Sequence, residues 1–442
     1  MVGLPMTRQR EDVESATELF DQFIQSCMFI HDDVLDELRT ENGELDWDQF
    51  GTNPFFVGAH TCVVDTLKGF GQTYLDYLND LQCLPETIIV PAHKGSSLLD
   101  NLLHDKSALD QLKYVARQRK LDISSFYSDQ AKDFERLIVY LSQDDYVPRL
   151  YPSKEEFQVL EDKITARGLL ATAGVPVPEG VVCTSIDEIR SFYGYSKRRG
   201  ITMLVKKHHW QTQAIDGDED IERLLVKIEF PVIAELAYEV VCSPVSHHIM
   251  WNSQARHLFI VDQVIENWRH YGNKLPHGLS RDLVARIVEY SSGTIKRRPS
   301  YAGVCGIDYI VTPENDVFAV DLNPRFNSST YPFYFLLKAG VQLDSICASF
   351  RFARIPVRDL SSVFTDPDFV PFKVGSPEGI LLLTPVFDFA NEAVIRFLYL
   401  AIATSHERLS GLERNLLNIL SMHQVTLQDP KVMKNVGTSS HH

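Results

Sequence analysis

One segment restricts the fold of this chain more than any other. It runs from Gly306 to Arg325 and reads Gly-Ile-Asp-Tyr-Ile-Val-Thr-Pro-Glu-Asn-Asp-Val-Phe-Ala-Val-Asp-Leu-Asn-Pro-Arg. Two runs rich in β-branched and aromatic residues flank Pro-Glu-Asn-Asp, a cluster that is typical of turns. The segment therefore predicts a β-hairpin of two antiparallel strands.

The register of this hairpin decides which side chains meet. With the turn centred between Glu314 and Asn315, Asp308 lies opposite Asp321. The same register pairs Ile310 with Ala319 and Thr312 with Val317. Because side chains alternate along a strand, Asn323 lies on the same face as Asp321. We expect two carboxylates and one amide on one face of the hairpin.

Two carboxylates directly opposite each other repel, so this pairing does not stabilise a sheet by itself. A hard divalent cation such as Mg²⁺ removes the conflict, because it takes oxygen ligands and is shared with substrate phosphates. Arg325 follows the strand, where its guanidinium can hold a phosphate or a carboxylate. The same pattern also fits a polar face in contact with solvent.

Length and charge exclude some classes of protein. A chain of 442 residues is expected to form two or three subdomains. Its formal net charge of -16, from 43 basic and 59 acidic residues, disfavours binding to nucleic acid or to an anionic membrane. A few lysines in a cleft can still attract a phosphate ligand.

Cysteines and apolar runs indicate a cytoplasmic protein. The seven cysteines include no Cys-x-x-Cys pair, which predicts reduced thiols rather than disulfides or a zinc site. The N-terminus lacks the apolar run of a secretory signal. The apolar stretch Ala393–Ala403 is short and contains Arg396, so it predicts a buried helix and no membrane span.

The order of predicted elements gives an α/β chain with three domains, residues 1–150, 151–355 and 375–430. In the first domain we expect helices over Glu18–Ile30, Asp65–Leu81 and Leu98–Arg119, and a strand over Thr87–Pro91. In the second domain we expect a helix over Lys163–Ala173, strands at Thr202–Lys206, Val232–Leu236, Ser246–Trp251, Leu258–Val264, Cys305–Val311 and Val317–Leu322, and a helix over Ser280–Lys296. The chain from Tyr331 to about 355 is expected to be mostly helical, and in the third domain a strand at Ile380–Thr384 should precede a pair of helices.

Several of these elements carry charged residues in apolar surroundings. Lys206 ends an apolar strand, where a lysine either reaches the surface or meets an anion. Glu235 lies inside an apolar strand, and an alternative for it is a carboxylate satisfied at a sheet edge. Of the adjacent His247 and His248, one should face the cleft and the other outward, so the two do not share one metal ion. The polar segment Trp268–Pro276 fits a substrate loop or an ordinary capping loop.

The order of these motifs resembles the ATP-grasp superfamily over roughly residues 85 to 350. The motifs are Lys163 before Gly-Val-Pro-Val-Pro178, Val-Lys206, Ala-Glu235, Gly-Ile-Asp308 and Asp321-Leu-Asn-Pro-Arg325. The resemblance implies an N-terminal α/β pre-ATP-grasp subdomain, a two-lobed clamp for ATP and a small C-terminal α/β unit. It also implies a ligase that activates a carboxylate as an acyl phosphate and joins it to an amine, releasing ADP and phosphate.

The resemblance also implies site residues. Lys163 and Lys206, with Lys207 as an alternative, look like the lysines that contact ATP phosphates. Glu235, Ala237 and Glu239 look like the hinge that binds the nucleoside. Asp308, Asp321 and Asn323 look like Mg²⁺ ligands, and Arg325 like the catalytic group that stabilises the acyl phosphate. For the substrate pocket we expect His208, His247, Asn327 and Ser328, although Asn327–Thr330 fits a helix cap equally well.

Two departures from the ATP-grasp pattern stand out. The loop after Lys206 contains no glycine, although backbone N–H groups of a glycine-rich loop usually hold the phosphates there. The segment Cys242–Ser246 stands where an acid for the ribose is expected, and it is similar to the branch of the pre-pheganomycin peptide ligase. That branch implies small-molecule or natural-product biosynthesis, with an amino acid or peptide among the substrates, and a homodimer is compatible with it. The alternatives are another phosphoryl-transfer enzyme of this fold and a non-catalytic ATP-binding module.

Overall fold

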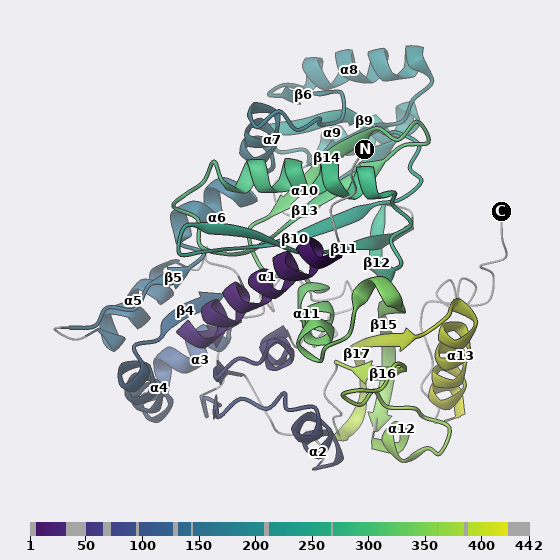
Figure 1. Cartoon of the computed structure of the whole chain (residues 1–442). Helices are drawn as coiled ribbons and strands as arrows, with labels where there is room; N and C mark the ends of the chain where they lie inside the picture. Colours follow the sequence, from purple (N-terminus) through teal and green to yellow (C-terminus); the bar gives the residue numbers. More distant parts are fainter. Residues whose placement is uncertain are drawn as a thin grey trace. The chain divides into compact units, whose positions relative to one another are not determined.

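The computed structural model describes residues 6–31, 50–64, 72–93, 97–126, 131–142, 145–206, 212–266, 268–359, 361–383 and 388–422. Two compact units make up the chain, and Figure 1 labels their elements. The first combines Met1–Lys154, Tyr271–Pro276 and Phe326–His442, and the second combines Glu155–His270 and His277–Arg325. The predicted α/β class is confirmed, whereas the division into three domains stays a prediction.

A parallel sheet organises the first unit, with the strand order β3-β2-β1-β4-β5. Its strands are β1 (Cys27–Ile30), β2 (Thr61–Val63), β3 (Thr87–Ile89), β4 (Asp122–Ser125) and β5 (Leu150–Tyr151). The helix predicted over Glu18–Ile30 is wrong at its end, because α1 (Met6–Ser26) stops before β1. All four residues of β1 are buried, as expected for a central strand whose two faces are both covered.

Helices cover this sheet. On one face, Met28 and Ile30 of β1 share a core with α3 (Leu98–His104), α4 (Lys106–Arg119) and α5 (Ala131–Leu141). The single helix predicted over Leu98–Arg119 is interrupted at Asp105, whose carboxylate caps α4 by accepting a 3.0 Å hydrogen bond from the Ala108 N–H. On the other face, the Phe29 ring contacts Phe23 of α1 and Phe326, with ring centroids 6.5 and 6.0 Å away. The unit also contains η2 (Phe50–Val57) and α2 (Gln72–Asp80).

The C-terminal region of the first unit is an antiparallel sheet in the order β12-β15-β17-β16. Its strands are β12 (Arg269–Leu275), β15 (Cys347–Asp359), β16 (Gly379–Leu382) and β17 (Asp388–Ala403). The helices are α11 (Thr330–Lys338), η3 (Leu343–Ser345), α12 (Ser361–Thr365) and α13 (His406–Met422). Of these, α13 contacts β15 and β17.

Three predictions for this region are wrong. The buried helix expected over Ala393–Ala403 lies within β17, which pairs with β15 on one side and β16 on the other. A strand in the middle of a covered sheet reads as a continuous apolar run, so periodicity cannot distinguish it from a buried helix. The helical stretch expected to reach 355 ends early because β15 begins at Cys347. The loop expected at Trp268–Pro276 is mostly strand β12.

The second unit begins with α6 (Lys154–Glu161) and α7 (Lys163–Thr172) and contains two antiparallel groups of strands. The smaller group has the order β6-β9-β7-β8. These strands are β6 (Gly180–Cys183), β7 (Met203–Lys206), β8 (Thr212–Ile215) and β9 (Val232–Leu236). Helices α8 (Ile186–Arg199) and α9 (Asp218–Lys227) share a core with them.

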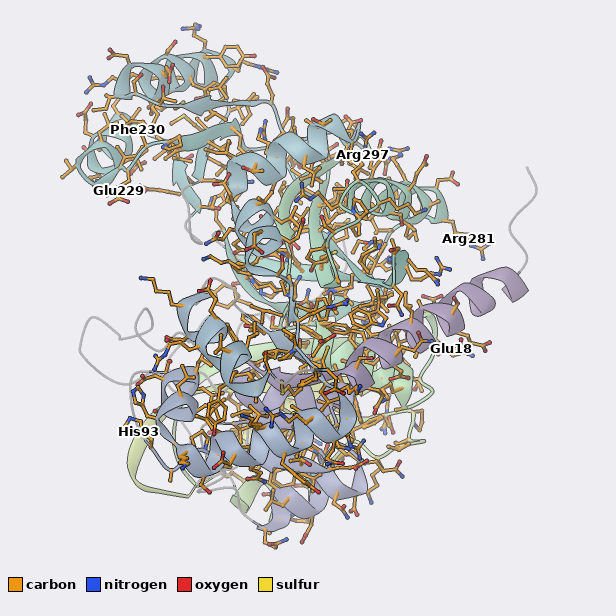
Figure 2. All side chains as sticks on the ribbon, turned by 90° about the vertical axis from the view of Figure 1, so that its left-hand side faces the viewer. Glu18, His93, Glu229, Phe230, Arg281 and Arg297 are labelled. Carbon is orange, nitrogen blue, oxygen red and sulfur yellow. The ribbon has the colours of Figure 1, made fainter. Side chains whose placement is uncertain are left out.

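The larger group has the order β14-β13-β10-β11. Its strands are β10 (Pro244–Trp251), β11 (Gln254–Glu266), β13 (Gly303–Val311) and β14 (Val317–Asn323). Helix α10 (Arg281–Ile295) buries Leu283 and Ile287 in the same core as Leu170 of α7, and Figure 2 shows Arg281 and Arg297 near its two ends. Helix α7 contacts both β14 and β9, so it links the two groups of strands. No helix in the described regions of the chain is long and apolar enough to cross a membrane.

Candidate functional site

The predicted hairpin exists, and it places two carboxylates opposite each other. Asp308 of β13 pairs with Asp321 of β14, as the sequence predicts. The rest of the predicted register is wrong by one residue, because Ile310 pairs with Phe318 and Val311 with Val317. A β-bulge leaves Val320 unpaired and brings the register back into phase at the carboxylates.

The turn explains the shift. It spans Thr312 to Asp316, and the Thr312 N–H donates to the Asp316 carbonyl oxygen over 3.0 Å. Asn315 has a positive φ of 65°, which asparagine tolerates better than most residues. The loop is thus centred on Glu314, half a residue from the predicted centre. The shift in register at the turn and the opposite shift at the bulge cancel, so Asp308 still pairs with Asp321.

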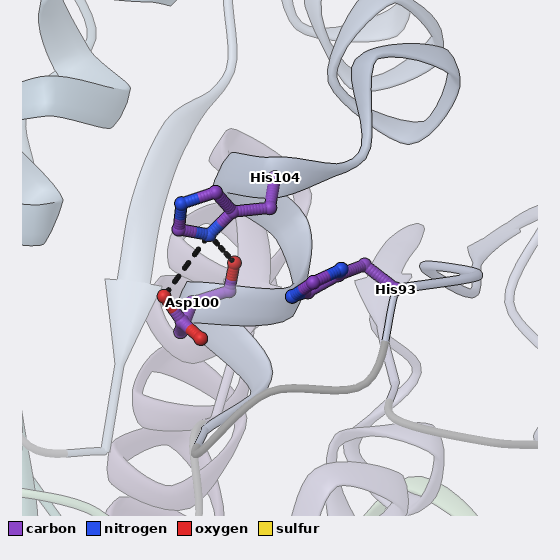
Figure 3. A group of neighbouring side chains, drawn as sticks. All are labelled: His93, Asp100 and His104. Atoms are coloured by element: carbon purple, nitrogen blue, oxygen red, sulfur yellow. Dashed lines mark hydrogen bonds and ion pairs between the residues drawn. The ribbon is translucent and has the colours of Figure 1, made fainter.

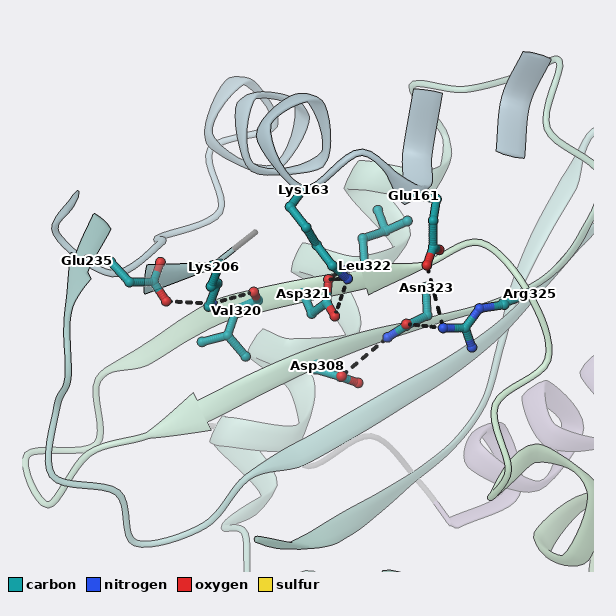
Figure 4. Close-up of polar contacts among 10 residues, drawn as sticks. All are labelled: Glu161, Lys163, Lys206, Glu235, Asp308, Val320, Asp321, Leu322, Asn323 and Arg325. Atoms are coloured by element: carbon teal, nitrogen blue, oxygen red, sulfur yellow. Dashed lines mark hydrogen bonds and ion pairs between the residues drawn. The ribbon is translucent and has the colours of Figure 1, made fainter. Parts of the chain in front are cut away.

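Two half-buried carboxylates and the buried amide of Asn323 form a cluster of oxygen ligands (Figure 4). The Asn323 amide donates to Asp308 Oδ2 over 3.2 Å. Burial and the neighbouring Asp321 raise the pKa of Asp308 to about 7. The other oxygen of this carboxylate, Oδ1, is buried and has no hydrogen-bond partner in the described structure. Such a carboxylate gains from a cation, so the donor set fits a hard divalent metal ion.

Helix α7 presents Lys163 to this cluster. The helix begins at Lys163 because Asp162 caps it, accepting a 2.7 Å hydrogen bond from the Thr165 N–H. The Lys163 ammonium lies 2.6 Å from each oxygen of Asp321. Burial alone lowers the pKa of Lys163, but the Asp321 and Glu161 carboxylates outweigh it and the net effect raises that pKa. The lysine is therefore a firm positive charge beside the oxygen cluster.

A second lysine reaches the cleft from strand β7. Lys206 lies 2.5 Å from Glu235 Oε1 and donates to the Val320 carbonyl oxygen over 2.9 Å. The Glu235 side chain is 2% exposed, and its other oxygen accepts from Arg167 over 3.0 Å. Lys206 therefore meets an anion inside the unit, which rejects the alternative in which it reaches the surface. Because the single carboxylate of Glu235 lies between two cations, Lys206 and Arg167, this group of three residues has a net positive charge.

Arg325 lies at the far end of the cluster (Figure 4). Its side chain is 5% exposed, and its guanidinium donates to Asn323 Oδ1 over 3.1 Å. The carboxylate of Glu161 lies 3.6 Å from the same nitrogen. Because the guanidinium is buried between these partners, its position is set before an anion binds.

Part of this set of residues lines one cleft of the second unit. The charged and polar residues along it come from α7, β7, β9 and β14, and they are Lys163, Arg167, Lys206, Glu235 and Asp321. Apolar side chains such as Leu170 and Val177 complete the wall. The cleft thus combines cations that suit phosphates with carboxylates that suit a divalent metal ion.

Solved structures share this arrangement of elements. The chain matches a biotin carboxylase from Campylobacter jejuni in a complex with β,γ-ATP at 13% identity and a TM-score of 0.58, covering 93% of this chain and 96% of that chain. It matches an N5-carboxyaminoimidazole synthetase from Staphylococcus aureus at 14% identity and a TM-score of 0.54, covering 86% and 99%.

A third match is the biotin carboxylase domain of the Hydrogenobacter thermophilus 2-oxoglutarate carboxylase, bound to MgADP, ADP and bicarbonate. It has 13% identity and a TM-score of 0.54, and covers 80% of this chain and 84% of that chain. No protein-family model and no curated protein matches the sequence. The three solved proteins are built on one fold. This chain has the ATP-grasp fold.

Two further charged residues of the candidate site are absent from the sequence-based prediction. Glu161 precedes the cap of α7, and Arg167 lies one turn after Lys163 on the same helix. The i, i+4 spacing of Lys163 and Arg167 is a usable signal, because it places two cations on one helix face. Glu161 has no such signal, since its partner Arg325 is distant in sequence.

The remaining hinge residues of the ATP-grasp resemblance lie after strand β9. The Ala237 N–H donates to the Thr202 carbonyl oxygen over 2.9 Å, and Glu239 is exposed. Lys207 and His208 fall outside the described residues, as does most of the glycine-free loop. The nucleoside-binding role of this segment stays a prediction.

The predicted substrate residues are found in two units. In the second, His247 of β10 is fully buried beside Gly306, which in turn pairs with Asn323, and its ring centroid lies 4.5 Å from that of Phe259. Burial, with a smaller effect from His257, lowers the pKa of His247 to about 3, so it is neutral. His248 is buried too, with its Nε2 2.9 Å from Ser246 Oγ, so the expectation that one of the pair faces outward is wrong.

Asn327 and Ser328 belong to the first unit. The Asn327 N–H donates to Thr330 Oγ1 over 2.9 Å, while its Oδ1 is buried and has no partner among the described residues. Ser329 stands at the N-cap of α11 but makes no side-chain capping bond.

One other group of side chains has the composition of a metal site. His93, Asp100 and His104 offer ligand atoms within 4.8 Å of one another (Figure 3). Asp100 and His104 are one turn apart on α3, and His104 Nδ1 lies 3.0 Å from the Asp100 carboxylate and 2.9 Å from its backbone oxygen. A helical Asp–His pair at the surface accounts for this geometry. Unlike Asp308, the two histidines are exposed.

Proposed function

We propose that this protein is an ATP-dependent ligase that activates a carboxylate as an acyl phosphate and couples it to an amine. The observation that carries the proposal is the pairing of Asp308 with Asp321, whose carboxylate also contacts Lys163. Two carboxylates can bind a divalent metal ion, and the lysine beside them can bind the polyphosphate that shares this ion. The solved neighbours with nucleotide bound support this assignment.

Each residue of the cleft has a proposed task. Lys163 and Lys206 bind the phosphates, and Glu235 with Arg167 holds Lys206 in place. Asp308, Asp321 and Asn323 fit Mg²⁺, since they offer oxygen atoms and one buried Asp308 oxygen has no hydrogen-bond partner in the described structure. Bound Mg²⁺ would neutralise negative charge on the transferring phosphoryl group.

The reaction then needs no nucleophile from the protein. A carboxylate oxygen of the substrate attacks the γ-phosphorus, the bond to the bridging oxygen breaks, and ADP leaves. The amine attacks the acyl carbon, loses a proton and expels phosphate. Arg325 stabilises the oxyanion, because its buried guanidinium is fixed by Asn323 and Glu161 before the substrate arrives.

A second candidate concerns the carboxylate. The Hydrogenobacter thermophilus domain is bound to bicarbonate as well as MgADP. Bicarbonate can therefore take the place of a larger carboxylate, and the first product is then carboxyphosphate. Natural-product biosynthesis, an amino acid or peptide substrate, the pre-pheganomycin ligase branch, a cytoplasmic location and a homodimer remain elements of the proposal that rest on the sequence.

Hydroxylamine can test the chemistry without the natural amine, because it traps an acyl phosphate as a hydroxamate. The purified protein is incubated with Mg-ATP, hydroxylamine and a panel of amino acids, peptides and small carboxylic acids, with bicarbonate as a separate arm. Hydroxamate together with ADP supports the ligase. ADP release that depends on bicarbonate alone supports the second candidate.

Two other results would change the assignment. AMP instead of ADP would indicate adenylation and contradict the acyl phosphate. Nucleotide binding without turnover of any acid or of bicarbonate would favour a non-catalytic ATP-binding module. The Arg325→Lys variant is the matched control, because it keeps the charge but loses the planar guanidinium.

A further inference from the structure

Lys163 occupies the place on Asp321 that a metal ion would need. Its ammonium lies 2.6 Å from both carboxylate oxygens, so it takes both of them at once. A divalent cation binds a carboxylate oxygen at ~2.1 Å, closer than a lysine does. Two cations cannot share the same two oxygens at these distances, because their charges repel.

The ion pair between Lys163 and Asp321 is largely shielded from solvent. The side chains of Lys163 and Asp321 are 15% and 26% exposed. Separating a lysine in such a position from its carboxylate is costly unless another anion takes the place of the carboxylate. The neighbouring Glu161 lies close to Arg325, so it is already balanced by a guanidinium. A phosphate entering the cleft is the anion that can draw Lys163 away.

We propose that Lys163 guards the metal site, so that a divalent cation binds weakly to the protein alone and tightly only together with a polyphosphate nucleotide. This inference rests on the proposed function and adds to it the order in which the nucleotide and the metal ion bind. The phosphate draws the ammonium from Asp321, and the metal ion takes the freed oxygens. Free Mg²⁺ is thereby kept from filling the site before the nucleotide arrives.

Lys206 provides the matched control. It lines the same cleft and carries the same charge, but its ammonium is held by Glu235 and the Val320 carbonyl oxygen. Removing it changes the charge of the cleft by one unit and leaves the contact between Lys163 and Asp321 in place. Any difference between the two lysines therefore reports the contact with Asp321 and not charge in general.

The test measures Mn²⁺ binding to the full chain by electron paramagnetic resonance of free Mn²⁺, without nucleotide. The proteins are wild type, Lys163→Met and Lys206→Met, with Asp321→Asn as the baseline for other Mn²⁺ sites. We expect Lys163→Met to bind Mn²⁺ at least about tenfold more tightly than wild type, and Lys206→Met to change the affinity less than about threefold. With ADP present, wild type should bind Mn²⁺ as tightly as Lys163→Met does without it.

The inference is overturned if Lys163→Met binds Mn²⁺ no more tightly than wild type, or if Lys206→Met gains as much. Lys163→Gln makes the same charge change and serves if Lys163→Met melts at a lower temperature than wild type. Failure of the proposed function has a different signature. In that case ADP fails to tighten Mn²⁺ binding to wild type, whatever the two lysine variants show.

Discussion

At the scale of single residues, alternation along a strand predicts the carboxylate cluster. Asp308, Asp321 and Asn323 meet as expected, because residues two apart share a face. The bulge at Val320 could not be predicted, since nothing in the sequence marks which residue stays unpaired. Glu161 was missed for a related reason. Its partner Arg325 is 164 positions away, the difference between 325 and 161, and short-range patterns do not reach that far.

Arg325 should be a strong determinant of stability as well as of chemistry. Arg325→Ala leaves the carboxylate of Glu161 buried without its guanidinium, which should lower the free energy of unfolding by about 3 kcal/mol. Urea denaturation measures this. The double variant with Glu161→Gln should recover some of the loss, and Arg297→Ala, at an exposed site, should change stability by less than about 0.5 kcal/mol. A loss in Arg325→Ala no larger than that of Arg297→Ala would contradict the buried pairing.

Asp308 should make the stability of the metal-free protein depend on pH. Its pKa in the folded protein is raised to about 7, mainly by burial and then by Asp321. The folded state therefore holds a proton that the unfolded chain has lost, and stability falls as pH rises from ~4 to ~7. Asp308→Asn has no such proton. In EDTA, the free energy of unfolding of Asp308→Asn minus that of wild type should increase between pH 5 and pH 8. A difference that stays constant would show that the pKa of Asp308 is not raised.

At the scale of elements, the sequence predicts most of the second unit and fails in the C-terminal region of the first. Strands with one polar partner face, such as β13 and β14, carry the alternation that identifies them. Strands buried between two neighbours carry continuous apolar runs, such as all of β1 and residues 397–403 of β17. Such a run favours a helix as readily as a strand. Helix ends are clearer, because Asp162 and Ser280 both act as side-chain caps.

The cap of α7 allows a test of how this helix serves the site. Asp162→Ala should lower the free energy of unfolding by ~1 kcal/mol and should also weaken ADP binding, because Lys163 is the first residue of the helix. Ser280→Ala removes the cap of α10 at a similar cost in stability. ADP titration by calorimetry should show weaker binding in Asp162→Ala only. Equal affinities in the two variants would mean that α7 does not position Lys163.

At the scale of the whole molecule, the order of motifs carries the prediction of the ATP-grasp fold, which the solved structures confirm. The two compact units could not be predicted, because each combines segments that are far apart in sequence. The substrates are equally absent from the pattern. The residues that select the substrates lie on loops, whose sequences have no helical or strand periodicity.

The most direct test of the central claim is thermal melting with and without millimolar MgADP, for wild type and Asp321→Ala. Binding to the folded state must stabilise it, by ~2.7 kcal/mol at a hundredfold excess over the dissociation constant. We expect the midpoint of wild type to rise with MgADP and the rise to be lost or strongly reduced in Asp321→Ala. The comparison is between the two rises, because the variant also removes the partner of Lys163. An unchanged midpoint in wild type at millimolar MgADP would contradict the nucleotide site.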